Sequence, residues 1–488
     1  MGDTDSLKRR TVSSMLWKLL ERGGCQLVSF VVQIALARIL DPTDFGMLAI
    51  VIVFVNVGSV FVQSGLNTAL IQAPEVDDED YSTVFFICLG VSLVLYAVVF
   101  FIAPWVEDFY QLEGLAVVLR VIALLLPIGA LNAVQVAIIT RELRLKSLFV
   151  ATISASLVSG VLGIGMALAG MGLWALVAQQ LAAQIVSSII MLPLTRWRPR
   201  IVFSIDKAKR HYKFGWKLLA SSLLHTAYMN LNDLIIGKVF SASDLGFFNQ
   251  GKRIPLACQS LFGATITSVL LSSASKLQDD LDRLRTLTRR AMQLTTYAVA
   301  PLMVFLAVAA SPIVEIVFTE KWLPCVPYLQ LFALACMLEP VTTSNIQTIN
   351  ALGRSDVVLK LEVVKKTIAI GVLLFTALII GDMLAIAIGN LLYSIIAAAI
   401  NARPLKRMLG YGGLSQLKDI APSYVVSAIA GVGTYFVGLG FADPAFQLLA
   451  QGVVFLLVFA MCSLLFKLEA LSYLLSLCKE IFGGYAEL

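Results

Sequence analysis

The chain consists mostly of apolar runs, each long enough to cross a lipid bilayer. A hydrocarbon core about 30 Å thick requires about 20 consecutive apolar residues in a helix. The sequence contains fourteen such runs, centred near residues 27, 57, 94, 127, 158, 183, 226, 258, 305, 337, 370, 392, 430 and 455. Because an isolated segment satisfies its backbone hydrogen bonds in lipid only as a helix, the pattern predicts an all-α integral membrane protein with fourteen transmembrane helices.

Composition agrees with this interpretation. Of 488 residues, 59% are hydrophobic and 14% are charged, whereas soluble domains carry about 25% charged residues. The first apolar run follows Lys8-Arg9-Arg10 but contains Arg22 and lacks a small-residue cleavage site. We therefore expect it to be a membrane span and not a removable signal peptide.

The distribution of cations predicts the orientation in the membrane. Of the 37 Lys and Arg residues, 31 fall at the two termini and in the even-numbered connections between spans. Cytoplasmic connections carry an excess of Lys and Arg, so both termini are expected to be cytoplasmic. The net charge of +6 reflects this bias. The basic stretches 195–200 and 207–213 are expected to face solvent or lipid head groups, and nucleic-acid binding is not needed to explain them.

Three internal echoes indicate a duplication. Residues 17–20 (WKLL) recur at 216–219, an offset of 199, and residues 38–46 (RILDPTDFG) are echoed by 238–246 (KVFSASDLG), an offset of 200. A third echo, Pro127, Asn132 and Arg141 with Pro340, Asn345 and Arg354, has an offset of 213. Similar echoes in the same order predict two six-helix lobes, related as parallel repeats around a central cavity and followed by two further helices.

This duplication predicts the domain organisation. The expected parts are an N-terminal lobe at 1–195, a basic cytoplasmic linker at 196–217, a C-terminal lobe at 218–404, two helices at 405–466 and a cytoplasmic tail at 467–488. Two similar lobes with a crevice between them are typical of alternating-access transport.

Polar residues follow helical faces within several spans. Arg22, Gln26, Ser29 and Gln33 lie on one face of the first span, and an offset of 199 places Ser221, His225, Tyr228 and Asn232 on one face of the seventh. Such residues can hold helices together, but stripes in the first two spans of both lobes favour an aqueous cavity. The candidate substrate-binding residues are Arg22, Gln26, Gln33, Asn56, Gln63, His225, Tyr228, Asn232, Asn249 and Arg253.

Charged residues within the predicted spans indicate which of them could bind a substrate or a coupling ion. Arg253 lies nine residues beyond Asp244-Leu245-Gly246, about 14 Å along a helix and so near the bilayer centre, where a charge is costly unless paired or hydrated. Asp233 and Glu339 are candidates for coupling a cation, with a plain ion pair as the other interpretation. The acidic Asp78-Glu79-Asp80 is similar to a glycosyltransferase DxD motif but has no soluble domain around it. With two histidines and no nucleophile or phosphate-loop motif, we expect no enzyme, cofactor or metal site.

Three segments resemble a known family. Residues 27–72, with the LAR-x-L-x-P-x-DFG turn, and residues 231–254 and 275–292 resemble bacterial polysaccharide-repeat exporters. These are flippases of the multidrug/oligosaccharidyl-lipid/polysaccharide (MOP) superfamily, and the resemblance points to its colanic-acid and teichuronic-acid exporters. The second copy of the turn departs from the pattern, with Ser241-Ala242-Ser243 in place of Asp41-Pro42-Thr43.

The resemblance implies transfer of an undecaprenyl-pyrophosphate-linked oligosaccharide from the inner to the outer leaflet of the bacterial cytoplasmic (inner) membrane. It also implies proton or sodium antiport as an energy source and a polysaccharide polymerase as a partner. Cationic residues would attract the pyrophosphate, and amides and hydroxyls would bind the sugars. Two alternatives stay open: a multidrug cation antiporter that uses Asp233 or Glu339, and a non-transporting subunit of a polysaccharide synthase complex.

Overall fold

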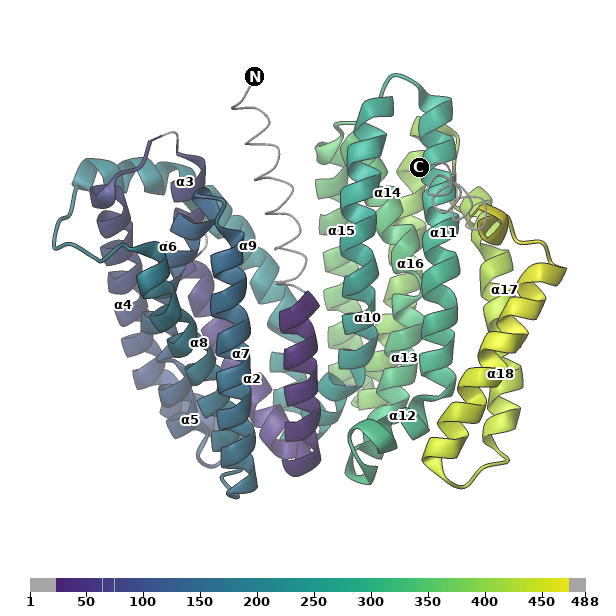
Figure 1. The fold of residues 1–488 in the computed structure, drawn as a ribbon, viewed down its shortest axis with the longest axis horizontal. Helices are drawn as coiled ribbons and strands as arrows, with labels where there is room; N and C mark the ends of the chain where they lie inside the picture. The colour runs from purple at the N-terminus through teal and green to yellow at the C-terminus, as the bar shows by residue number, and fades with distance from the viewer. Residues whose placement is uncertain (1–22, 64, 74, 474–488) are drawn as a thin grey trace, which may run out of the picture. The chain divides into compact units, whose positions relative to one another are not determined.

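The computed structural model describes residues 23–63, 65–73 and 75–473 (Figure 1). Over these ranges the regular secondary structure is helical, as the apolar runs predict. The chain forms two compact units, residues 1–246 and 247–488, which we call unit 1 and unit 2.

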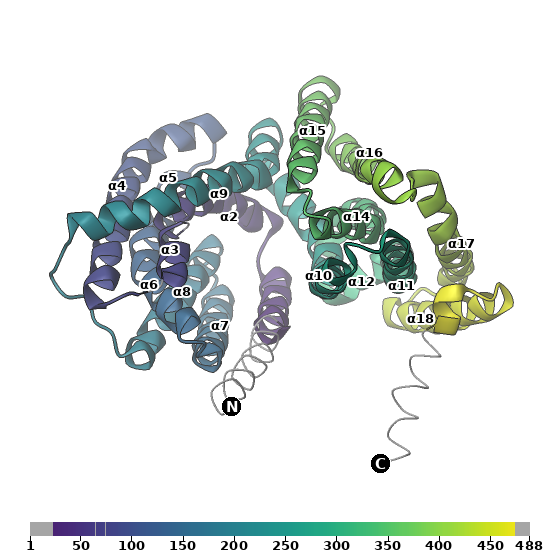
Figure 2. The same ribbon diagram turned by 90° about the horizontal axis from the view of Figure 1, so that it is seen from above.

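Unit 1 is a bundle of long helices with a core at one end. It contains a helix at Gly23–Ile39, then α2 (Pro42–Gln63), α3 (Leu66–Gln72), α4 (Asp78–Tyr110), α5 (Leu115–Ile122), α6 (Leu125–Arg141), α7 (Leu145–Leu168), α8 (Leu173–Thr195), α9 (Ile205–Val239) and the start of α10 (Ala242–Ala274). Apolar side chains of α2, α3, α4 and α6 form one core cluster, which Trp197 completes. Helix α9 packs against α2, α3 and α4, and its first turns lie across the ends of other helices of the unit (Figure 2).

Unit 2 contains the rest of α10 and the helices that follow it. They are η1 (Ser275–Leu277), α11 (Leu281–Val308), α12 (Ala310–Val317), η2 (Glu320–Cys325), α13 (Val326–Cys336), α14 (Glu339–Ala351), α15 (Ser355–Leu374), η3 (Phe375–Ile380), α16 (Met383–Leu409), α17 (Gly413–Gly438) and α18 (Pro444–Leu465). Its main core cluster joins α11, α14, α16 and α17 around Met292, Ile349 and Tyr411.

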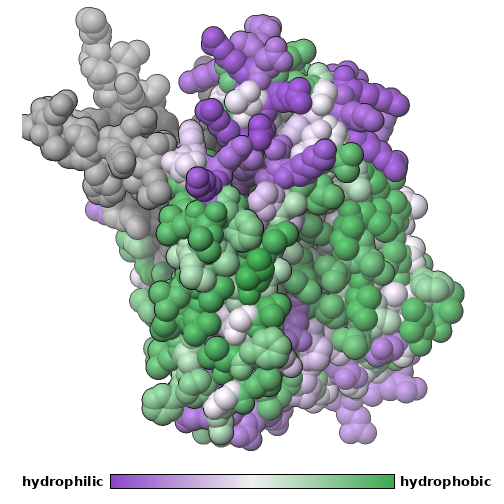
Figure 3. Space-filling model, turned by 90° about the vertical axis from the view of Figure 1, so that its right-hand side faces the viewer, coloured by the Kyte–Doolittle hydropathy of each residue, from purple (hydrophilic) through white to green (hydrophobic). Residues whose placement is uncertain are grey.

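Thirteen of the fourteen predicted span centres fall within a helix, and the centre near residue 337 lies in the short turn between α13 and α14. Within the described ranges, eleven helices are long and apolar enough to cross a membrane, and Gly23–Ile39 is a shorter apolar helix. Helices α9 and α10 are long but more polar, so fourteen as the number of spans stays a prediction. The face of unit 2 that carries α17 and α18 shows a continuous apolar band with polar residues at both ends (Figure 3), as a lipid-facing surface requires.

The two copies of the repeated turn begin their helices with the same hydrogen bond. The Asp44 carboxylate accepts from the backbone N–H of Asp41 at 3.3 Å. In the second copy Asp244 accepts from the backbone N–H of Ser241 at 3.2 Å and from its hydroxyl at 2.6 Å. An aspartate in the first turn also favours the positive end of the helix dipole. The replacement of Asp41 by Ser241 therefore leaves this helix start intact.

The same two turns lie directly against each other in unit 1. A β-carbon added at Gly46 would lie 1.7 Å from the carbonyl oxygen of Ala242, and one added at Gly246 would lie 2.1 Å from that of Pro42. Positions 46 and 246, and positions 42 and 242, are equivalent at the offset of 200. The contact is therefore reciprocal, as a local two-fold arrangement of duplicated turns requires, and glycine leaves the space for it.

The asparagines of the third echo bind neighbouring helices. The Asn132 amide on α6 lies 3.3 Å from the hydroxyls of Ser187 and Ser188 on α8. On α14 the buried Asn345 exchanges two hydrogen bonds with Gln416 of α17, at 3.0 and 2.9 Å. Both asparagines thus hold helices together within their own unit.

The Asn345–Gln416 pair gives a prediction for stability. Replacing Gln416 by leucine leaves the buried Asn345 amide without these two partners, and replacing Asn345 leaves the Gln416 side-chain oxygen without its donor, while the Gln416 nitrogen keeps the Tyr411 carbonyl. Either change is expected to lower the free energy of unfolding by about 1 to 3 kcal/mol. The double variant Asn345→Leu/Gln416→Leu is expected to be less destabilised than the sum of the two single variants. Thermal unfolding of the four purified proteins measures this coupling, and strict additivity would contradict it.

Candidate functional site

A polar pocket lies between α2 and α9 in unit 1. Its volume is about 350 Å³. The lining residues are Asn56, Ser59, Val60 and Gln63 of α2 and His225, Thr226, Met229 and Asn230 of α9. On each helix these residues are three or four positions apart, so they share one face. Two helices thus present polar faces to one space within an otherwise apolar bundle.

Hydrogen bonds connect the two walls of the pocket. The side-chain amide of Asn56 donates to the Asn230 side-chain oxygen at 3.1 Å, and the Asn230 amide donates to the backbone carbonyl of Thr226 at 2.8 Å. Asn56 is nevertheless exposed, so it keeps hydrogen-bonding capacity toward the pocket. An asparagine amide has two donor hydrogens and an acceptor with two lone pairs, which suits it to bind a ligand with hydroxyl groups.

The pocket offers uncharged hydrogen-bonding chemistry. Amides, hydroxyls and one imidazole stand beside two apolar side chains, Val60 and Met229. None of the described residues that line it is acidic, and none is Lys or Arg. Neutral donors and acceptors next to an apolar patch match a sugar ring, whose hydroxyls need partners and whose C–H face is apolar. Chemically, the pocket fits an uncharged polyhydroxyl ligand better than an organic cation.

Three of the predicted substrate-binding residues, Asn56, Gln63 and His225, meet in this pocket. Thr226, Met229 and Asn230 line it too, although the sequence analysis did not single them out. The offset of 199 transferred a polar stripe from the first span onto Ser221, His225, Tyr228 and Asn232, whereas α9 faces α2 with residues 225, 226, 229 and 230. Reading α9 for its own polar pairs four residues apart would have identified Thr226 and Asn230.

The other candidates in unit 1 lie elsewhere. Gln33 donates to the Gln179 side chain of α8 at 3.3 Å, and Gln26 is exposed on the helix Gly23–Ile39. Tyr228 and Asn232 belong to α9 but do not line the pocket. Arg22 lies outside the described residues.

The remaining candidates in unit 2 lie on α10. Asn249 and Arg253 are partly buried, and the Arg253 guanidinium donates to the Gln250 side chain at 3.1 Å. The ammonium of the neighbouring Lys252 lies 5.4 Å from the ring centroid of Phe248, a cation–π contact. The two adjacent cations thus have different surroundings.

The candidates for ion coupling lie in different units. Asp233 is on α9 in unit 1, and Glu339 begins α14 in unit 2. The Thr343 hydroxyl donates to the Glu339 carboxylate at 2.8 Å. Among the described residues, no group of three or more His, Cys, Asp and Glu side chains is placed to hold a metal ion.

The acidic start of α4 is occupied by ion pairs. Asp77 caps the helix by accepting from the backbone N–H of Asp80 at 2.8 Å, and the Lys207 ammonium lies 2.6 Å from Asp77 and 2.7 Å from Glu79. The hydrogen bond from Lys207 and that from the Asp80 N–H hold the pKa of Asp77 well below its ordinary 3.8. Because the folded-state pKa is lowered, this pair stabilises the fold above about pH 3.8 and its contribution is lost as the pH falls further.

Asp80 is the buried member of this acidic turn. Its side chain is 4% exposed and lies 2.6 Å from the Arg210 guanidinium and 2.9 Å from His211 Nε2. The DxD-like residues Asp78, Glu79 and Asp80 thus bind basic groups of the same unit, Asp78 through Arg200 at 3.1 Å. Their arrangement supports a structural role.

The burial of Asp80 predicts a large stability effect. Asp80→Asn is expected to lower the free energy of unfolding by about 2 to 3 kcal/mol, below the usual 3 to 5 for a buried pair, because Arg210 is half exposed. The matched control is Glu142→Gln, which removes an exposed ion pair with Arg144 and is expected to cost about 1 kcal/mol or less. Equal thermal unfolding temperatures for the two variants would refute a structural role for the acidic turn.

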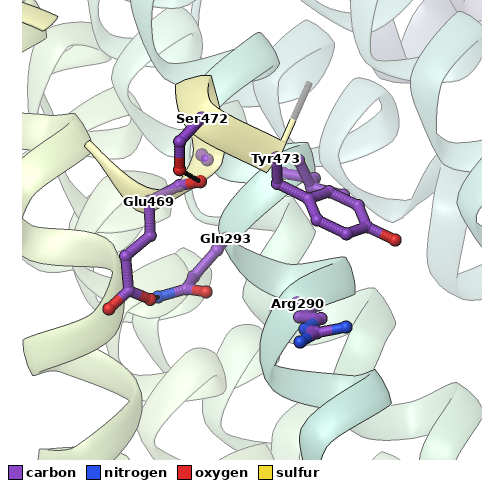
Figure 4. A pocket seen from close by; sticks show the side chains of 7 residues that line it. Arg290, Gln293, Glu469, Ser472 and Tyr473 are labelled. Atoms are coloured by element: carbon purple, nitrogen blue, oxygen red, sulfur yellow. Dashed lines mark hydrogen bonds between the residues drawn. The ribbon is translucent and has the colours of Figure 1, made fainter. Parts of the chain in front are cut away.

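Unit 2 has a second polar pocket, of about 290 Å³, between α11 and the segment that follows α18 (Figure 4). Glu469 accepts from Arg289 at 3.2 Å and from Gln293 at 3.3 Å. The Arg290 guanidinium lies 5.4 Å from the ring centroid of Tyr473. These contacts fasten the segment to α11. The pocket contains none of the predicted site residues, so the α2/α9 pocket is the better candidate.

Comparisons with known proteins show the family to which the chain belongs. A profile of the family described as "Polysaccharide biosynthesis protein" matches residues 35–327. The lipopolysaccharide biosynthesis protein WzxC of Escherichia coli K12 is 24% identical over 402 residues, which cover 81% of this chain and 80% of WzxC. The teichuronic acid biosynthesis protein TuaB of Bacillus subtilis 168 is 21% identical over 95% of this chain and 96% of TuaB.

Solved structures show the same fold. The lipid II flippase MurJ in an inward closed conformation superposes with a TM-score of 0.76 at 14% identity, over 93% of this chain and 98% of MurJ. An inward-facing multidrug resistance transporter of the MATE family, in the MOP superfamily, gives a TM-score of 0.59 at 16% identity, over 78% of this chain and 95% of the transporter. The predicted all-α transporter fold is confirmed.

Proposed function

Because the chain belongs to the polysaccharide biosynthesis protein family, and so to the transporters of the MOP superfamily and not to the enzymes, we propose that it moves a lipid-linked oligosaccharide across the cytoplasmic membrane. The substrate would be an undecaprenyl-pyrophosphate-linked repeat unit, carried from the inner to the outer leaflet by alternating access, with both termini cytoplasmic. The names of WzxC and TuaB, which refer to lipopolysaccharide and teichuronic acid biosynthesis, support an envelope polysaccharide as the product.

The α2/α9 pocket is the observation that carries this proposal. Its amides, hydroxyls and imidazole supply neutral partners for sugar hydroxyls, and Val60 and Met229 supply an apolar surface for the ring face. By contrast, an antiporter of organic cations needs acidic groups in its binding site. The absence of acidic residues among the described lining residues gives that alternative no support.

In this proposal the pyrophosphate is attracted by arginine. Arg253 makes no ion pair with a carboxylate among the residues that the structure describes, and its guanidinium hydrogen-bonds only to the neutral Gln250 amide. A planar guanidinium can bind phosphate oxygens through two parallel hydrogen bonds. Arg22 is the second proposed cation, and Asp233 and Glu339 are the groups proposed to couple a proton or sodium ion to transport.

Export of polymer in a deletion strain tests the proposal. Wild-type protein is expected to restore the polysaccharide, whereas Arg253→Ala is expected to abolish export with normal amounts of folded protein in the membrane. Lys252→Ala is the matched control, because it removes the adjacent cation that contacts Phe248, and it should retain most of the export. Normal export from Arg253→Ala would remove this residue from the mechanism, and normal polymer in the deletion strain itself would contradict the proposed function.

A further inference from the structure

Residues 196–216, which we call the interface segment, are fixed to unit 1 by a buried anchor. Trp197 is 6% exposed. Its ring lies 6.2 Å from the Tyr81 ring and 6.0 Å from the Phe85 ring, both edge to face. Contacts of this geometry add to the energy of burial. The segment therefore leaves the end of α8 along a defined path.

Hydrogen bonds hold the middle of the interface segment against α4. The backbone N–H of Arg200 donates to the Ser82 hydroxyl at 3.2 Å, and that of Ser204 donates to the Thr83 hydroxyl at 3.2 Å. Ion pairs from Lys207 to the acidic turn follow within the first turn of α9. One side of the segment is thus fully engaged with the protein.

The interface segment also carries large apolar residues that are exposed in the part of the chain that the structure describes. Ile201 is 96% exposed, Ile205 63%, Tyr212 60%, Phe203 54% and Trp216 47%. Exposed apolar groups gathered in one segment mark a contact surface.

The position and charge of the interface segment identify its partner. It lies between the end of α8 at Thr195 and the acidic turn that starts α4, so it is level with the ends of two membrane spans. Arg196, Arg198 and Lys209 are exposed and, within the described part of the chain, make no ion pair. Apolar side chains beside unpaired cations fit the boundary between acyl chains and anionic head groups.

We propose that the interface segment docks on the membrane surface and preferentially gathers anionic phospholipids around unit 1. The side chains at positions 201, 203 and 205 enter the boundary of the acyl region, and the three unpaired cations bind head-group phosphates. This local lipid environment is a property of unit 1 and is independent of the transported substrate.

Fluorescence quenching in a bilayer tests the preference for anionic lipid. A cysteine-free full-length protein carrying Phe203→Cys is labelled with an environment-sensitive nitrobenzoxadiazole probe and placed in nanodiscs of phosphatidylglycerol and phosphatidylcholine in equal amounts. Spin-labelled phosphatidylglycerol is expected to quench the probe at least about twofold more than the same fraction of spin-labelled phosphatidylcholine, because three cations attract the anionic lipid.

Charge variants identify the cations responsible. In the triple variant Arg196→Gln/Arg198→Gln/Lys209→Gln, the two spin-labelled lipids are expected to quench the probe equally. The control triple Arg403→Gln/Lys406→Gln/Arg407→Gln removes three exposed cations from unit 2 and should keep the preference. Equal quenching by the two lipids in the labelled protein that keeps all its cations would overturn the proposal. An unquenched probe would overturn it as well, since that result indicates that solvent or a protein partner covers the segment.

Discussion

Gly46→Ala is expected to destabilise unit 1 strongly and to reduce the amount of folded protein in the membrane. The new methyl group would lie 1.7 Å from the Ala242 carbonyl oxygen, 2.5 Å from its carbonyl carbon and 3.1 Å from its α-carbon. These are backbone atoms at the start of α10, so the clash cannot be relieved by a side-chain rotation. Overpacking of this kind typically costs about 1 to 3 kcal/mol, and the reciprocal variant Gly246→Ala is expected to behave alike.

The same substitution at Gly90 provides a control, because it is not expected to destabilise the protein. Gly90 lies within α4, and a β-carbon added there meets nothing within 4 Å. Alanine in a helix interior is more favourable than glycine by about 1 kcal/mol, so Gly90→Ala should be neutral or stabilising. Thermal unfolding in detergent measures both variants. The reciprocal turn contact is refuted if Gly46→Ala unfolds at the same temperature as Gly90→Ala.

Asn56→Leu/Asn230→Leu is expected to reduce export severely while the protein stays folded. Leucine at both positions removes the hydrogen bond between the pocket walls without leaving one amide unpaired, so stability should change little. Each neutral hydrogen bond to a sugar contributes about 1 kcal/mol, so loss of both amides is expected to lower export about tenfold or more. Polymer released by the complemented deletion strain, normalised to folded protein, gives the result.

A pair of conservative substitutions tests whether export depends on the hydrogen-bonding groups at positions 56 and 230. Asn56→Ser/Asn230→Ser keeps a donor and an acceptor at each position and is expected to retain part of the export. If the leucine pair and the serine pair export equally well, the pocket does not bind the substrate through these residues.

Much of the fold follows from the spacing of apolar residues, because lipid leaves a helix as the only conformation for an isolated span. The helix starts at Asp44 and Asp244 follow from local chemistry. The contact between Gly46 and Ala242 could not be predicted, since it depends on how two distant turns approach each other. The repeat shows only which positions are equivalent.

The candidate site was predictable in part, because the spacing of polar residues shows which of them share one face of a helix. A polar face on α2 identified Asn56 and Gln63, and the echo of the first span identified His225. Asn230 was missed because the stripe was transferred by offset, while the packing of α9 on α2 determines which face of α9 lines the pocket. That packing depends on close approaches such as Gly237 against Ile50, where an added β-carbon would lie 2.8 Å from the isoleucine side chain.

Transfer of substrate by the purified protein tests the central claim most directly. Full-length protein is reconstituted into liposomes that contain a fluorescent undecaprenyl-pyrophosphate-linked oligosaccharide, and a membrane-impermeant reagent reports how much label crosses the bilayer. Wild-type protein is predicted to move the label well above the rate in empty liposomes, and Asn56→Leu/Asn230→Leu is predicted to move it about tenfold more slowly than the wild type, or slower still. No movement by the folded wild-type protein under an imposed proton or sodium gradient, or equal movement by the leucine pair, would contradict the account.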